Sequence, residues 1–145
     1  MISPNNKVLL KIIFLIILFN PTISKSNEIP SMSFQDFLFE YADHKGSKVM
    51  IKDAALHIWD NPTDKKGSMC DTALCGDGFF IQFDKMSTAS YKKLFLSCKN
   101  NGVITGGDYY SRNTFYCGIS DTLVYVNDYS VNIIASVLEV NITER

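Results

Sequence analysis

Four cysteines carry the most reactive side chains of this chain, and their spacing limits the chemistry that they can perform. Cys70 and Cys75 stand five residues apart, just before an apolar run, and Cys98 and Cys117 follow. Thioredoxin-like redox chemistry uses a C-x2-C pair, and Cys98 and Cys117 do not form a second pair at zinc spacing. An even number of cysteines favours disulfides if a small domain is exported, which is what the N-terminal residues of this chain predict. Of the three connectivities that four cysteines allow, we favour Cys70–Cys75 with Cys98–Cys117.

The histidines and aspartates provide few further candidates for catalysis. His44 falls near the end of a predicted helix and His57 within a predicted strand, where structural roles are expected. Asp71, Asp77 and Asp84 could supply oxygen ligands for calcium, but they lack the spacing of an EF-hand loop, and a solvated acidic loop is favoured. We therefore predict no catalytic residue, no metal ligand and no cofactor. The alternative is a small secreted hydrolase that uses Asp71 or Asp77 with His57.

Residues 1–26 have the features of a secretory signal peptide. Two lysines precede an unbroken apolar run over residues 12–19, and small and polar residues follow, with cleavage expected after Ser24 or Ser26. The run is shorter than the roughly 20 residues that a membrane-spanning helix needs. A removed signal is thus favoured over a retained membrane helix. We expect a secreted or periplasmic protein, with residues 27–145 as a single domain and no stable membrane anchor.

The charge of the remaining chain bears on its partners. Residues 1–26 contain three lysines and no acid, so their removal changes the formal net charge from −1 to −4. A nucleic-acid-binding surface requires clustered basic residues. The sequence therefore argues against nucleic acid and leaves a protein, a peptide or a glycan as the expected partner.

The hydrophobic pattern predicts a mainly β, α+β domain with two short helices. Residues 33–45 read as an amphipathic helix, capped by Ser33 and stopped by Gly46. Residues 60–77 read as a turn-rich cysteine loop, and 103–113 as a loop or an irregular hairpin. The other predicted elements are one strand or two over 47–59 with a kink near Asp53, a strand over 78–86, a helix over 87–99, and strands over 114–126 and 129–140. Residues 131–140 could also be helical, but a strand is favoured.

Three segments carry a resemblance to a known fold: KVMIKDAALHIWDNP, GFFIQFDKMSTASYKKLFLSC, and FYCGISDTLVYV with NIIASVLEV. Their order resembles that of exported bacterial OB-fold domains, over roughly residues 47–140. The resemblance implies a five-stranded barrel with an N-terminal helix and a second helix between the third and fourth strands. The inserted segments at 60–77 and 100–113 depart from the minimal fold.

Aromatic residues are more numerous than a core of this size needs. OB-folds bind extended ligands by stacking on a strand face, and the candidates for such a face are Trp59, Tyr109, Tyr110, Tyr116 and Tyr125. The sequence therefore predicts a non-enzymatic exported domain that contacts its ligand or partner through this face and the inserted loops. A factor released outside the cell to act on a host remains a second alternative.

Overall fold

The computed structural model describes residues 27–101, 103–104 and 113–145. The predicted signal peptide, Tyr109 and Tyr110 lie outside the described residues. In chain order the elements are β1 (Ser31–Ser33), α2 (Phe34–Glu40), the 3-10 helix η1 (Tyr41–His44), β2 (Lys48–Trp59), β3 (Lys66–Cys70), β4 (Gly78–Gln82), α3 (Thr88–Asn100), β5 (Val103–Ile104), β6 (Thr114–Val126) and β7 (Ile134–Glu144). The expectation of a mainly β, α+β domain with two short α-helices is confirmed.

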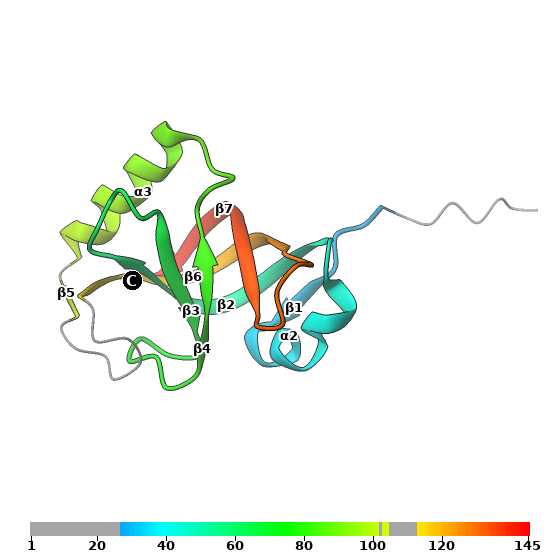
Figure 1. Ribbon diagram of the computed structural model, residues 1–145. Helices are drawn as coiled ribbons and strands as arrows, with labels where there is room; N and C mark the ends of the chain where they lie inside the picture. Colours follow the sequence, from blue (N-terminus) through cyan, green and yellow to red (C-terminus); the bar gives the residue numbers. More distant parts are fainter. Residues whose placement is uncertain (1–26, 102, 105–112) are drawn as a thin grey trace, which may run out of the picture.

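The strands pair in the order β1-β2-β3-β4-β7-β6-β5, and β2 pairs in addition with β6 (Figure 1). The pairings therefore form a circuit from β2 through β3, β4, β7 and β6 back to β2. The pairing of β4 with β7 is parallel, whereas the other four pairings of the circuit are antiparallel. β1 and β5 extend the sheet outside this circuit.

The prediction of five strands is wrong, because the described residues contain seven. Two short strands, β1 and β3, were not expected, and β5 falls in the segment predicted as a loop or an irregular hairpin. The segment ending at Trp59 is one strand, which is one of the two options that the sequence left open. The predicted kink near Asp53 is present: Asp53 has a φ of 55°, and the β2–β6 register shifts between Ile51 and Ala54. The strand over 134–144 confirms the favoured reading of that segment over a helix.

Both helices begin where the sequence indicates. The Ser33 hydroxyl caps α2 by accepting a hydrogen bond from the Asp36 N–H, and the Ser87 hydroxyl accepts one from the Ser90 N–H at the start of α3. Past η1 the chain turns at Gly46, whose φ of 75° favours glycine.

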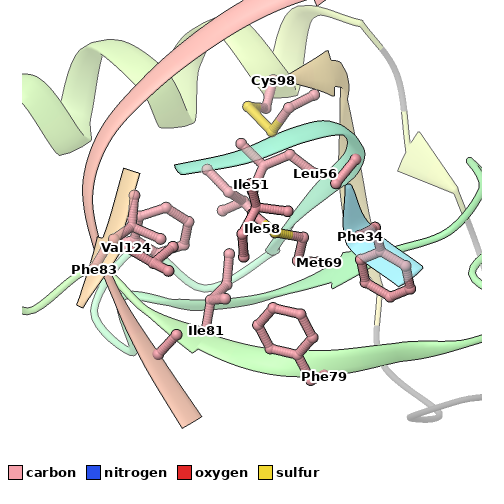
Figure 2. Packing of buried hydrophobic residues seen from close by; sticks show 14 of the residues in the cluster. Phe34, Ile51, Leu56, Ile58, Met69, Phe79, Ile81, Phe83, Cys98 and Val124 are labelled. Atoms are coloured by element: carbon pink, nitrogen blue, oxygen red, sulfur yellow. A yellow bond between two sulfur atoms is a disulfide. The ribbon is translucent and has the colours of Figure 1, made fainter. Parts of the chain in front are cut away.

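The core consists of side chains from the strands of the sheet and from both helices, and each helix packs aromatic side chains against one part of it (Figure 2). From α2, Phe34 and Phe37 pack on Phe79 of β4, with ring centroids 5.9 and 5.2 Å away. From α3, Phe95 packs edge-on against Phe115 of β6 at 5.5 Å. Figure 1 shows the two helices at opposite ends of the sheet.

Two disulfides link these elements, with the pairing expected from the sequence. Cys98–Cys117 joins the end of α3 to β6 and is buried, whereas Cys70–Cys75 closes the loop between β3 and β4. Together they suggest an oxidising, exported environment. In the part of the chain that the structure describes, no helix is long and apolar enough to cross a membrane.

Candidate functional site

The candidate site lies on the face of β2 that points away from the core, near the end of the strand. Leu56 and Ile58 enter the core, so His57 and Trp59 project to the opposite side. These two residues are nevertheless buried, with 3% and 9% of their surfaces exposed. Something other than the core must therefore cover this face.

The loop closed by Cys70–Cys75 provides part of that cover. His57 Nε2 lies 2.7 Å from the carbonyl oxygen of Ala73 in this loop, and a carbonyl only accepts, so Nε2 carries the proton. On its other side the His57 ring packs against Tyr116 of β6, with centroids 5.3 Å apart. Burial lowers the pKa of His57, and the hydrogen bond to Ala73 offsets this only in part. His57 is thus a neutral imidazole held between the loop and the sheet.

Trp59 forms the centre of an aromatic and cationic cluster across three strands. Phe80 of β4 meets the indole edge-on, with centroids 5.9 Å apart, and Lys66 Nζ of β3 lies 5.8 Å from the indole centroid. Phe80 is 38% exposed. We call Trp59, Phe80 and Lys66 the Trp59 cluster.

A cavity of about 230 Å³ opens beside this cluster, lined by Trp59, Asp60, Asn61 and Asn113. The Asp60 N–H donates to the carbonyl of Asn113 at 3.0 Å, which joins the end of β2 to the segment before β6. Asn61 Oδ1 accepts from the N–H and the hydroxyl of Thr63, an Asx-turn that orders the cavity's rim. The wall therefore combines an indole with a carboxyl and two amides.

The predicted ligand-face residues are only partly brought together. Trp59 and Tyr116 both belong to the covered end of the sheet, around His57. Tyr125 is nine positions beyond Tyr116 on β6, roughly 30 Å along an extended strand, and Lys85 Nζ lies 5.1 Å from its ring. Tyr125 is therefore not part of this cluster, because one strand carries both tyrosines at distant positions.

Of the acidic residues in the disulfide loop, Asp71 orders the loop through its carboxylate. Asp71 Oδ1 accepts hydrogen bonds from the N–H groups of Thr72 and Asp77, at 2.9 and 3.0 Å. The hydrogen bond of His57 Nε2 goes to the Ala73 carbonyl and not to an aspartate of this loop. Within the described ranges, Asp71, Asp77 and Asp84 do not gather into a group at metal-binding distance.

His44 lies away from these residues, on η1. Its Nε2 is 3.6 Å from Glu40 Oε2, one helical turn earlier in the chain. This places His44 at the helix end, as predicted, where it makes a local contact with an exposed carboxylate.

A second cavity, of about 530 Å³, lies between α3 and β7. Its lining includes Lys85, Lys93 and Glu139 with apolar Leu94 and Leu138. The serines at its helix end already bond to one another, since Ser87 and Ser90 form the N-cap of α3. Because the lining contains both positively and negatively charged side chains, it indicates no single class of ligand.

Sequence reasoning missed Phe80, Lys66 and the polar residues of the smaller cavity. The alternation of Phe79, Phe80 and Ile81 contained the signal for Phe80, because a residue between two core positions must face outward. Lys66 had no such signal, since β3 was read as part of a loop.

Comparisons with protein family models, with curated proteins and with solved structures gave no match to this chain.

Proposed function

We propose that this chain is an exported, non-enzymatic binding domain of the OB-fold type, which holds an extended ligand against the Trp59 cluster. The observation that carries the proposal is the cavity beside Trp59, where an aromatic wall meets a carboxyl and two amide side chains. Pockets of this composition orient a ligand by a few polar groups while aromatic surface provides the contact area.

The strand circuit supports the OB-fold part of the proposal. An OB-fold is a five-stranded Greek-key barrel, and five strands, β2, β3, β4, β6 and β7, account for the whole circuit of pairings. The helix α3 connects the third of these strands to the fourth. In this reading β1 and β5 are additions outside the barrel.

The position of the cavity supports the binding part. OB-folds bind oligosaccharides and oligonucleotides on the face of their second and third strands and on the loop between the first two. The second and third strands of the circuit are β3 and β4, which carry Lys66 and Phe80. The loop between the first two begins at Asp60 and Asn61, which line the cavity.

Among the expected ligand classes, the lining favours a glycan. Asp60 offers carboxylate oxygens, and Asn61 and Asn113 offer amides that both donate and accept, which suits neighbouring hydroxyl groups. A nucleic acid is disfavoured by the net charge of −4 that follows removal of residues 1–26.

The proposal can be tested by fluorescence, because Trp59 is the only tryptophan of the chain. The protein is titrated with a panel of soluble polysaccharides and oligosaccharides while the emission of Trp59 is recorded. We expect a saturable change of Trp59 emission with one glycan class. A Phe80→Ala variant should bind that glycan about 10-fold more weakly, because an aromatic contact contributes about 1.4 kcal/mol.

The matched control is Phe39→Ala on α2, because Phe39 is 85% exposed and lies on a helix that is not part of the cluster. This variant should bind as the unsubstituted protein does. If no glycan changes the emission of the folded protein, or if Phe80→Ala binds as tightly as Phe39→Ala, the proposed site is wrong.

A further inference from the structure

His57 has one ring nitrogen whose hydrogen-bonding capacity is not used. Nε2 donates to the Ala73 carbonyl, and Nδ1 is buried with no hydrogen-bond partner in the described part of the chain. Leaving a buried acceptor without a partner is costly, so such a group in a folded protein calls for an explanation.

The hydrogen bond to Ala73 also determines which ring nitrogen can act as a ligand. Because Nε2 carries the proton, Nδ1 of the neutral ring carries the free lone pair. Histidines that bind metals have this arrangement: one nitrogen coordinates, and the other donates its N–H to a carbonyl or carboxylate that fixes the ring. Ala73 thus already holds the His57 ring in the state that a metal requires.

The sulfur atoms of Cys70 and Cys75 lie next to this ring. One nitrogen of His57 and the two Sγ atoms all fall within 4.8 Å of one another. This is the one group of at least three potential metal-ligating side chains in the ranges that the structure describes. Cys70 and His57 are buried, and Cys75 is half-buried in an exposed loop, so Cys75 can be reached from solvent.

We infer that reduction of the Cys70–Cys75 disulfide creates a zinc-binding site in which both thiolates and His57 coordinate the ion. With a phosphine reductant the S–S bond breaks, water supplies the oxygen of the phosphine oxide, and two thiols form. Zn²⁺ then replaces the two thiol protons, which are released to solvent, and its charge is balanced by the two thiolates.

The geometry of zinc fits the space. With Zn–S bonds of about 2.3 Å and a Zn–N bond of about 2.0 Å, tetrahedral zinc places neighbouring ligand atoms about 3.5–3.8 Å apart. The present separations, all within 4.8 Å, thus need only a small adjustment, mainly of the sulfurs moving apart once they are no longer bonded. Cys75 can supply that movement because it lies in the loop rather than in β3.

Charge favours Zn²⁺ over a monovalent thiophilic ion. Two thiolates and a neutral imidazole make an uncharged complex with Zn²⁺, whereas Cu⁺ would leave a net negative charge beside buried residues, which is costly. Three protein ligands leave a fourth position for water, as in open zinc sites.

The test uses the full chain, reduced with a phosphine and freed of reductant without air, then titrated with Zn²⁺ in competition with a chromophoric chelator. We expect one zinc per chain in the reduced protein and none in the oxidised protein. Co²⁺ in place of Zn²⁺ should show sulfur-to-metal charge transfer together with the absorption of a tetrahedral ion.

Two matched pairs of variants separate this site from others. His57→Gln should weaken zinc binding by at least about 10-fold, because loss of an outer-shell partner alone already weakens metal binding about 10- to 100-fold. His44→Gln should leave zinc binding unchanged. Cys70→Ser with Cys75→Ser should abolish binding, whereas Cys98→Ser with Cys117→Ser should preserve it.

The inference is overturned if the reduced protein binds no zinc, or if His57→Gln binds as tightly as His44→Gln. It is also overturned if binding follows Cys98 and Cys117. Circular dichroism of each reduced variant shows whether it is folded; should the second cysteine pair be needed for folding, the two histidine variants decide the question. None of these outcomes depends on a glycan, so failure here leaves the proposed binding function standing.

Discussion

Removal of the Cys98–Cys117 disulfide should destabilise the domain more than removal of Cys70–Cys75. The first bond closes a loop of sequence separation 19 and the second one of separation 5. In the chain-entropy model a disulfide restricts the unfolded chain, and the restriction grows with the logarithm of loop length. The model gives about 3.2 kcal/mol for the longer loop and about 2.1 kcal/mol for the shorter one at 25 °C.

Packing acts in the same direction. Cys98 and Cys117 are both buried, whereas only Cys70 of the other pair is. Replacement of both cysteines by alanine removes buried sulfur and leaves small cavities, which adds to the cost. We therefore expect Cys98→Ala with Cys117→Ala to exceed Cys70→Ala with Cys75→Ala by at least about 1 kcal/mol.

The assay is urea unfolding at pH 7, followed by Trp59 emission and by far-ultraviolet circular dichroism. Coincident transitions justify a two-state free energy for each variant. The free energy of unfolding should also decrease most steeply with urea concentration for the variant without Cys98–Cys117, because its unfolded chain exposes more surface. If the Cys70–Cys75 variant loses as much stability as the other, loop length does not control the contribution of these bonds and the reasoning fails.

Three further predictions concern Gly67 of β3, the N-cap of α3 and the Lys52–Asp121 ion pair. A Cβ at Gly67 of β3 would overlap the His57 carbonyl oxygen, so Gly67→Ala should lower the free energy of unfolding by several kcal/mol, measured by urea unfolding. The control is Gly76→Ala in the open disulfide loop, which should change that free energy by less than about 1 kcal/mol. Ser87→Ala removes the N-cap of α3 and should cost about 1 kcal/mol in thermal or urea unfolding; a cost near zero would show that the cap is dispensable. The hydrogen bonds that Asp121 accepts from Lys52 and from the Asp53 N–H lower the pKa of its carboxyl group. The ionised carboxylate therefore stabilises the fold above its ordinary pKa, and this stabilisation is lost as the pH falls through the lowered pKa. The stability difference between the unsubstituted protein and Asp121→Asn should therefore shrink between pH 7 and pH 3 in urea unfolding, and a difference that stays constant would contradict this role.

The sequence predicted elements whose side chains alternate or repeat at helical spacing. The segment that became α3 has aromatic and aliphatic residues on one face and a serine cap, and β4 places Phe79 and Ile81 on one side. The kink in β2 was also visible, since the alternation of apolar residues breaks near Asp53. These features are local, and local rules sufficed for them.

β3 escaped prediction because its residues, Lys66–Cys70, include lysine, glycine and serine and lack a hydrophobic pattern. It is a strand because β2 and β4 pair with it on both sides, and Gly67 admits the close approach of the β2 backbone. Such a strand is stabilised by tertiary pairing, which overrides weak local propensity.

The neighbours of His57 could not be read from the sequence for a related reason. His57 and Cys70 stand thirteen positions apart, and the register that pairs Ala55 with Cys70 and His57 with Ser68 brings them onto one face. A shift of one residue in that register would have moved Cys70 to the core side. The even cysteine count and the expected export favoured disulfides, and Cys70–Cys75 was the favoured pairing of one of them, but the histidine beside it was not predicted.

The pairing of β2 with β6 has a consequence for the order in which the chain can fold. Val49 pairs with Val124, so one side of β2 has its partner 75 residues later in the chain. At synthesis rates of roughly 5–20 residues per second, β2 waits about 4–15 s before that partner exists. Contacts of such high sequence separation also slow folding, because the long loop must close before they form. During biosynthesis the apolar residues of β2 therefore lack their β6 partners until most of the domain has been made, which makes this strand the part of the chain with the longest exposure to aggregation.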